Sequence, residues 1–164
     1  ATRRITIAPE NSSGNNRLAW LLVTCSDPSF WDPNRAVTLA SKAVGLRPEK
    51  PHYWGTLGTA YYRAGNYSES IKSLDKAIEL DTERESFPQH TVFLAMAYWQ
   101  LSEFEKARHA YDEFEQWCSE NEPTDEDLIR FRAEAKMLFD GDSQSRSSTE
   151  GSRQVNSLTT SQNE

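Results

Sequence analysis

The feature that most constrains the fold is a pattern of apolar and small residues that recurs along the chain. Between residues 54 and 80, two stripes with helical spacing lie on either side of Gly65. The first stripe, spaced i, i+3, i+4 and i+7, is Trp54, Leu57, Gly58 and Tyr61, and the second is Ile71, Leu74, Ala77 and Ile78. This spacing is typical of one buried helix face, and a glycine between two such stripes is typical of a turn with positive φ. The segment therefore predicts two antiparallel helices joined at Gly65.

The same pattern occurs in two further segments. In residues 88–119, Leu94, Ala95 and Tyr98 take the places of Leu57, Gly58 and Tyr61. Residues 16–48 repeat it less regularly, because the loop between the two expected helices is enlarged at residues 26–31. Repeated helix pairs bury their apolar faces against their neighbours, so about three copies are needed for a stable array. The chain has enough copies for a short helical solenoid.

The pattern resembles the tetratricopeptide repeat, whose signature is W-x2-L-G-x2-Y, then A-x3-F, then P. The first part is present in full, whereas Ser70, Leu74 and Thr82 stand where the family has Ala, Phe and Pro. The resemblance implies an all-α fold, a right-handed superhelix of antiparallel helix pairs with a C-terminal capping helix. The alternative is an unrelated antiparallel helical bundle that shares the same stripe.

Further stretches resemble a bacterial subfamily of these repeats that is common in planctomycete-type genomes. They are residues 18–25, 32–37, 53–58, 93–97 and 131–135. Segments of that subfamily often end much longer chains, including serine/threonine protein kinases. The resemblance implies a similar context for this chain.

The predicted organisation has three parts. Residues 1–15 are expected to be a flexible linker, and residues 16–140 to form the repeat domain. Within that domain lie an irregular repeat (16–48), two repeats (51–82 and 88–119) and a capping helix (124–140). The capping helix is expected to begin at a capping box, Thr124 to Asp127, and to cover the last repeat. Residues 141–164 are rich in Ser and Thr and have few sizeable apolar residues, which predicts a disordered tail.

Charge and composition exclude several classes of partner. The net charge of −7 argues against nucleic-acid binding, since nucleic-acid binders present basic stripes. The sequence has no apolar run of membrane-spanning length. Two isolated cysteines fit a reducing compartment, so we expect a cytoplasmic protein. The chain begins at Ala1 rather than Met, which leaves open that it is a piece of a longer chain. The missing targeting signals therefore exclude few cellular locations.

No motif in the sequence predicts catalysis. His52, His90 and His109 do not have the spacing of metal ligands, and the glycines do not form a phosphate-binding loop. The nucleophile-elbow motif of serine hydrolases is also missing. We therefore expect a non-enzymatic protein without a cofactor or a metal.

Residues that could bind a partner follow from the resemblance. In tetratricopeptide proteins the first helix of each pair lines a concave groove, where ligands usually lie. Carried over to this sequence, the groove positions are His52, Thr59, Tyr62, Arg63, Gln89, Val92, Met96, Trp99, Gln100 and Trp20. Aromatic residues with Arg are frequent anchors of protein interfaces. The alternative is that Trp20 and Trp99 pack against loop residues such as Phe30, Trp31 or Phe87.

One known ligand class of the family can be tested on the sequence. Members that bind chaperone tails clamp a terminal carboxylate with Lys, Arg and Asn in the groove. The matching positions here are Asn16, Trp20, Thr56, Gln89 and Phe93, of which only Asn16 agrees. The predicted function is therefore a scaffold that binds a peptide or helix of another protein, without a carboxylate clamp. A regulatory or recruitment module of a larger enzyme and a structural assembly subunit stay open as alternatives.

Overall fold

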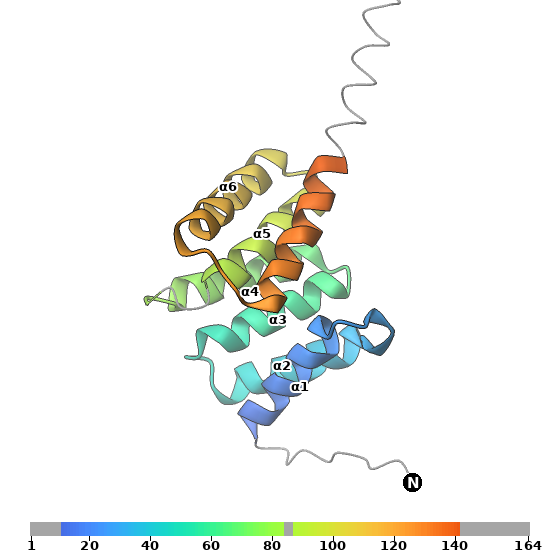
Figure 1. The fold of residues 1–164 in the computed structure, drawn as a ribbon. Coiled ribbons are helices and arrows are strands. Elements are labelled where there is room, and N and C mark those ends of the chain that lie inside the picture. The colour runs from blue at the N-terminus through green and yellow to red at the C-terminus, as the bar shows by residue number, and fades with distance from the viewer. Residues whose placement is uncertain (1–10, 84–86, 142–164) are drawn as a thin grey trace, which may run out of the picture.

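The protein is described here by a computed structural model, which describes residues 11–83 and 87–141. These residues form α-helices and one short 3-10 helix, and contain no strand, which confirms the predicted all-α class. The labelled elements are α1 (Ser12–Thr24), η1 (Pro28–Phe30), α2 (Pro33–Leu46), α3 (Pro51–Arg63), α4 (Tyr67–Leu80), α5 (Phe87–Gln100) and α6 (Phe104–Asn121). A last helix, residues 126–141, is drawn in orange to red in Figure 1 and is called the C-terminal helix below.

The helices form three successive pairs. α1 packs on α2, α3 on α4 and α5 on α6, and each pair also contacts the next. α3 contacts both α1 and α5, so the first helices of the pairs form one continuous layer. Figure 1 shows this array running from α1 and α2 to α5 and α6. This is the helical-repeat architecture that the recurring stripes predict.

The turn and the close helix contact predicted for the middle pair are both present. Gly65 has a φ of 77°, a conformation that glycine adopts without steric cost. At Gly58, a Cβ atom would lie only 2.6 Å from Cγ of Leu74, so a larger residue would push α3 and α4 apart. Ser70 lies where the family has Ala, and its hydroxyl donates to the carbonyl of Gly58 at 2.8 Å. The polar substitution is therefore satisfied inside the pair.

Two helix starts differ from the prediction. α1 begins at Ser12, inside the stretch predicted to be a linker, because the Asn11 side chain accepts a hydrogen bond from the Gly14 amide and caps the helix. The C-terminal helix is capped by Asp125 rather than Thr124, since Asp125 Oδ1 accepts from the Leu128 amide at 2.8 Å. The predicted tail beyond residue 141 lies outside the described residues.

Candidate functional site

The concave surface of the array holds the C-terminal helix. α1, α3 and α5 supply this surface, and Figure 1 shows the C-terminal helix crossing α5 and α3, with its first turns near the end of α1. Phe131, in the middle of that helix, is fully buried. Its ring meets Trp20 of α1 edge-on at 6.0 Å and Phe93 of α5 at 4.9 Å between centroids. A single side chain of the C-terminal helix therefore joins the first and third pairs.

Apolar packing continues on both sides of Phe131. The largest buried cluster combines Leu128, Phe131 and Ala135 with residues of α4, α5 and α6: Leu74, Val92, Phe93, Leu94, Met96, Phe114 and Cys118. Further along the helix, Phe139 lies 4.4 Å from Trp99 and stacks on Tyr111 at 4.4 Å. The helix thus covers the last repeat, as predicted, and in addition reaches back to the first.

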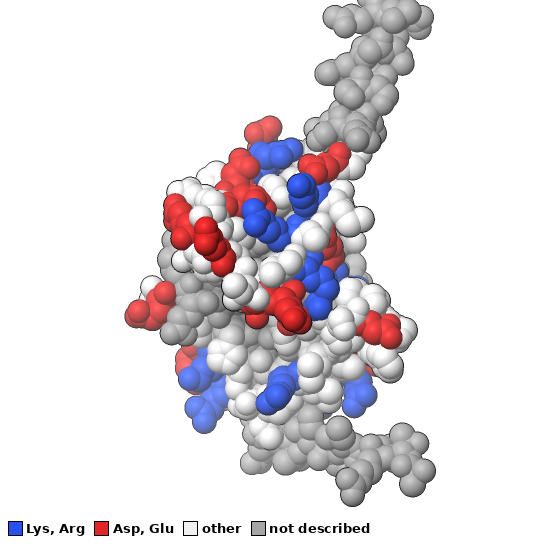
Figure 2. All heavy atoms as spheres, viewed as in Figure 1, with Lys and Arg blue, Asp and Glu red and all other residues white. Residues whose placement is uncertain are grey.

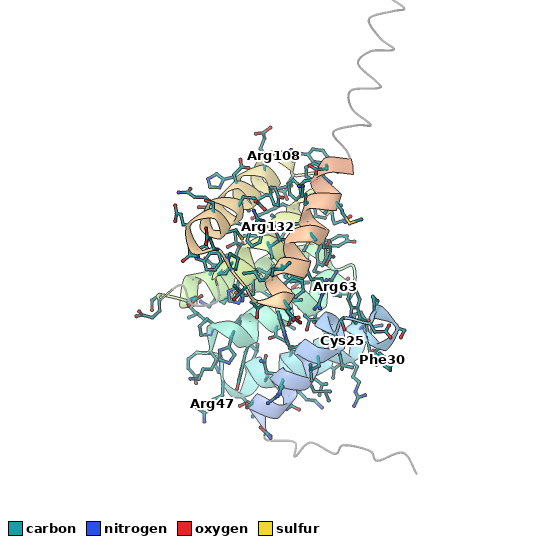
Figure 3. The ribbon with its side chains drawn as sticks, in the orientation of Figure 1. Cys25, Phe30, Arg47, Arg63, Arg108 and Arg132 are labelled. Atoms are coloured by element: carbon teal, nitrogen blue, oxygen red, sulfur yellow. The ribbon has the colours of Figure 1, made fainter. Side chains whose placement is uncertain are left out.

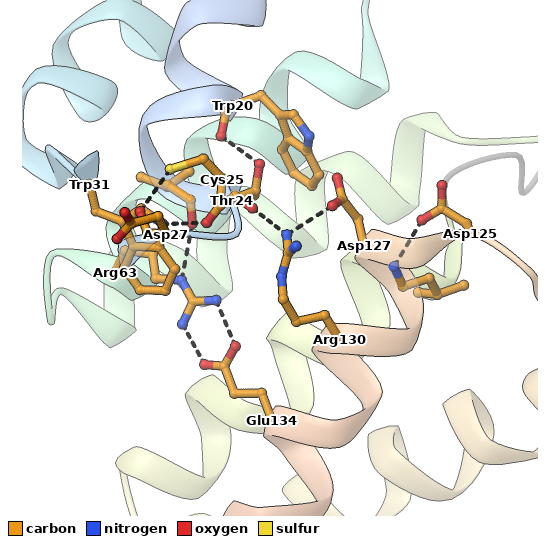
Figure 4. A network of polar contacts seen from close by, with 12 residues as sticks. Trp20, Thr24, Cys25, Asp27, Trp31, Arg63, Asp125, Asp127, Arg130 and Glu134 are labelled. Carbon is orange, nitrogen blue, oxygen red and sulfur yellow. Dashed lines mark hydrogen bonds and ion pairs between the residues drawn. The ribbon is translucent and has the colours of Figure 1, made fainter. Parts of the chain in front are cut away.

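A partly buried ion pair fixes the C-terminal helix to α3. The two terminal guanidinium nitrogens of Arg63, Nη1 and Nη2, donate to the Glu134 carboxylate, and the Nη2–Oε2 distance is 2.6 Å (Figure 4). Arg63 also donates from Nε to the Val23 carbonyl at 3.3 Å, and its Cζ lies 4.3 Å above the Trp31 ring. Only 8% of the Arg63 side chain is exposed. Bidentate Arg–carboxylate pairs impose geometry as well as attraction, so this pair sets the position of the helix in the groove.

A second arginine anchors the start of the same helix. Arg130 donates to the Thr24 carbonyl at the end of α1 and to Asp127 at 2.8 Å (Figure 4). Figure 3 shows Arg63 on the side of the C-terminal helix that faces α1, and Arg132 on the side that faces α6. Arg132 pairs with Glu115 of α6, with Nε–Oε1 at 2.9 Å. On the face seen in Figure 2, acidic and basic side chains are interspersed over the C-terminal helix and α6.

All but one of the residues predicted to line the groove fall into two groups; the exception, Gln100, is exposed at the end of α5. Thr59, Val92 and Met96 are fully buried, and Tyr62, Arg63, Trp20 and Trp99 lie in the aromatic and ionic contacts beneath or beside the C-terminal helix. Burial is the main cause that raises the pKa of Tyr62 to about 12. The groove that the sequence places open to a partner is thus filled here by the protein's own helix. That the predicted groove residues bind an external partner stays a prediction.

Trp20 and Trp99 pack on aromatic side chains of other helices, whereas the Phe87 side chain, which was also considered for them, lies outside the described side chains. Trp20 packs on Phe131 and Trp99 on Phe104 and Phe139. Phe30, in the enlarged loop, is 71% exposed instead, and Trp31 stacks beneath Arg63. Sequence reasoning missed the residues that fill the groove, Phe131 and Glu134. The i, i+3 and i+7 spacing of Leu128, Phe131 and Ala135 signals an apolar face, but not the surface that this face meets.

The second group lies at the end of the concave surface that the C-terminal helix does not cover, called the uncovered end below. A pocket of about 210 Å³ opens there, lined by Asn16, Trp20, His52, Gly55, Thr56, Gln89 and His90. All of them belong to α1, α3 or α5, and the C-terminal helix contributes nothing to this wall. Trp20, His52 and Gln89 were predicted groove residues; His90 was not. Four of the five positions that match the carboxylate clamp line this pocket, and its described lining contains no Lys or Arg.

The pocket wall carries polar atoms that lack a hydrogen-bond partner within the described residues. They are Asn16 Oδ1, Gln89 Oε1 and His90 Nδ1. His90 is only 4% exposed, and its Nε2 edge lies against α3, where a Cβ on Gly55 would approach to 2.0 Å. Burial lowers the pKa of His90 to about 4, so the imidazole is neutral at pH 7. Burial, followed by the charge of Lys50, also lowers the pKa of His52.

A larger hollow lies away from these residues. It measures about 650 Å³ and is lined by residues of α5 and α6, most of them charged: Leu94, Tyr98, Glu105, Lys106, Arg108, His109, Ala110, Asp112 and Glu113. Its lining includes no predicted groove residue. Shallow hollows with charged rims are usual between surface helices, whereas unpartnered buried polar atoms are not. The concave surface is therefore the better candidate site.

Comparisons with known proteins agree with this architecture. Residues 51–84 match the family model of the tetratricopeptide repeat. A search of curated protein sequences found no match. The chain is similar to the first TPR domain of the human RPAP3 protein, with a TM-score of 0.58, 14% identity, and coverage of 84% of this chain and 99% of that one. It is also similar to the Sgt2 TPR domain from Aspergillus fumigatus, with a TM-score of 0.57, 16% identity, and coverage of 88% of each chain.

A third similar structure is MamA, with a TM-score of 0.56, 18% identity, and coverage of 83% of this chain and 82% of that one. These likenesses show that the fold is an all-α, tetratricopeptide-type helical repeat. The fold suggests a protein–protein interaction module. Among the described helices, none combines the length and the apolar character that a membrane span requires.

Proposed function

We propose that the chain is a protein-interaction module that receives an amphipathic helix in its concave groove, and that its own C-terminal helix is the resident occupant. Helix-in-groove recognition uses apolar anchors at i, i+3, i+4 and i+7 against an apolar groove. Leu128, Phe131 and Ala135 provide such anchors, and they enter the same buried cluster as Val92 and Met96. The seating of this helix against α1, α3 and α5 is the observation that carries the proposal.

The charged contacts add selectivity for one register of the bound helix. Arg63 is almost fully buried, and its guanidinium requires an acidic partner at one position of the occupant. Glu134 supplies it, three residues after Phe131. An external helix with an aromatic residue followed three positions later by Glu or Asp would reproduce both contacts. We therefore infer that partners compete with the C-terminal helix for the same surface.

A labelled peptide of residues 124–141 tests the proposal with the full-length chain as receptor. In the unmodified chain the tethered helix competes at an effective concentration of about millimolar, so the peptide should bind weakly. Glu134→Lys in the chain repels Arg63 and loosens the resident helix, and we expect the peptide to bind it at least about tenfold more tightly. Fluorescence anisotropy measures both affinities.

Two further variants complete the design. Asp140→Lys reverses a charge on the exposed end of the same helix and should leave peptide binding unchanged. Arg63→Glu should lose binding of the native peptide and regain it with a peptide that carries Glu134→Lys. Equal peptide affinity for the unmodified and Glu134→Lys chains, with both folded by circular dichroism, would overturn helix binding in this groove.

A second role is supported by the sequence resemblance to bacterial repeats that end longer chains. In that case the module would regulate a larger enzyme, such as a serine/threonine protein kinase, or recruit its substrate. The complete gene decides between a module within a larger enzyme and a protein of about this length. An open reading frame that starts close to Ala1 would remove this alternative.

A further inference from the structure

The pocket at the uncovered end of the groove has an unusual set of unsatisfied groups. Buried polar atoms in proteins nearly always have a hydrogen-bond partner, and exceptions call for a specific explanation. Here Asn16 Oδ1, Gln89 Oε1 and His90 Nδ1 all lack one within the described residues, and all three side chains line one pocket. His90 is only 4% exposed, so burying its imidazole away from water without a hydrogen-bond partner at Nδ1 is costly. The three atoms together indicate a place kept for a ligand group.

The size of the pocket limits that group. Sites for drug-sized molecules and cofactors usually measure about 300–1,000 Å³. At about 210 Å³, this pocket has room for one amino-acid side chain rather than a whole cofactor. Its walls are the ring of Trp20, the imidazoles of His52 and His90, and the backbone at Gly55. The occupant is therefore a small group with a flat apolar side.

The charge of the residues that line the pocket decides whether this small group is anionic, cationic or neutral. A carboxylate would bring only acceptors to two acceptor oxygens, and among the described residues no Lys or Arg lines the pocket. An ammonium group would lose its hydration, and among the described residues no carboxylate lines the pocket to replace it. Two charges outside this lining act with opposite sign, that of Asp81 on His90 and that of Lys50 on His52. A neutral group avoids both penalties.

We propose that this pocket binds the carboxamide group of an asparagine or glutamine side chain on a partner polypeptide. A primary carboxamide has two N–H donors, one for each of the Asn16 and Gln89 oxygens. Its carbonyl oxygen accepts from His90 in the neutral tautomer that carries its proton on Nδ1, and the proposal requires that tautomer. The inference rests on the proposed function in one respect, that the concave surface meets a polypeptide partner.

The pocket can be probed without a partner by four small molecules of nearly equal shape: propionamide, N-methylpropionamide, propionate and propylammonium. The readout is the shift of the Asn16 and Gln89 side-chain NH₂ signals and the Trp20 indole N–H signal in ¹⁵N-resolved NMR spectra of the full chain. A ligand of five non-hydrogen atoms can reach about micromolar affinity at best, and we expect about millimolar affinity for these probes. We expect saturable shifts with propionamide, and binding at least about tenfold weaker for the two charged probes.

Gln89→Met should abolish the saturable shift, whereas Gln116→Met, the same change on the exposed face of α6, should not. Saturation by propionate or propylammonium at lower concentration would overturn the ligand class. No saturable shift with any probe would mean that water alone satisfies these atoms, and would overturn the site. The assay does not use the groove peptide, so its failure leaves helix binding standing, and failure of the peptide assay leaves the pocket result standing.

Discussion

The concave surface has a covered part and an uncovered part, and they differ in chemistry. Beneath the C-terminal helix the surface is apolar, and its arginine has a carboxylate, a carbonyl and an aromatic ring as partners. At the uncovered end the surface is neutral and polar, and three of its atoms have no partner among the described residues. Satisfied contacts stabilise a fold, whereas unsatisfied ones cost stability and persist where something else uses them. The covered part therefore holds the structure together, and the uncovered part is poised for a ligand.

The largest test of this contrast removes the central side chain of the covered part. Phe131→Ala should lower the free energy of unfolding by about 3–5 kcal/mol, because a fully buried ring between Trp20 and Phe93 is lost. Urea denaturation followed by circular dichroism measures it. Met137→Ala, on the same helix but 78% exposed, should change stability by no more than about 0.5 kcal/mol. Equal effects of the two substitutions would mean that the C-terminal helix is not docked in solution.

The next test uses pH on the uncovered part. His90 has a pKa of about 4 when folded, mainly because it is buried, against 6.5 when unfolded. Between these values the unfolded chain binds more protons, so stability falls as the pH is lowered from about 6.5 to 4. The full loss is about 3 kcal/mol. His90→Gln should remove this part of the pH dependence in denaturation curves, and His109→Gln, at an exposed position, should retain it. A retained slope in His90→Gln would place the titrating group elsewhere.

The sequence predicts the covered and uncovered parts unequally well. The helix pairs follow from local information, since Leu57, Gly58 and Leu74 lie close in sequence and their spacing encodes their packing. The contact of Arg63 with Glu134 spans 71 positions, and no periodic pattern relates the two residues. The apolar stripe of the C-terminal helix shows that this face of the helix must be buried. Several apolar surfaces of the helix array could bury it. Its seating in the groove is a tertiary property.

The pocket was only partly predictable for a different reason. Trp20, His52 and Gln89 lie at groove positions of the repeat, so their location follows from its register. His90 occupies the next position after Gln89 and, in the sequence, looks like an ordinary polar residue. Its burial depends on Gly55 of the preceding pair, which leaves room for the imidazole ring. The missing side chain of Gly55 thus makes room for the buried ring of His90. Spacing patterns in the sequence do not predict such a relation between two residues of different helix pairs.

The contrast can be sharpened by breaking the ion pair of the covered part. Glu134→Ala leaves the guanidinium of Arg63 with the Val23 carbonyl and the aromatic rings of Trp31, Tyr62 and Phe93, but without a carboxylate. Because Glu134 is 34% exposed, solvent screens part of the loss, and we expect a cost of about 1–2 kcal/mol. Glu79→Ala, which breaks an exposed pair with Lys76, should cost under about 0.5 kcal/mol. A double-mutant cycle with Arg63→Met isolates the pair, and a coupling energy near zero would remove its role in seating the helix.

The smallest expected effect is the most informative about function. Ser70 and Gln89 are both polar residues at the inner faces of helices, but the Ser70 hydroxyl donates to a carbonyl and Gln89 Oε1 has no partner within the described residues. Ser70→Ala should therefore cost about 1 kcal/mol, as expected for a satisfied buried hydrogen bond. Gln89→Met should change the free energy of unfolding by less than about 0.5 kcal/mol, or raise it, because no hydrogen bond to that oxygen is lost. A residue that can be replaced without loss of stability, and whose replacement abolishes carboxamide binding, is held in the sequence for binding. If Gln89→Met instead costs as much as Ser70→Ala, Gln89 is structural, and the division of the concave surface into a stabilising and a binding part fails at this residue.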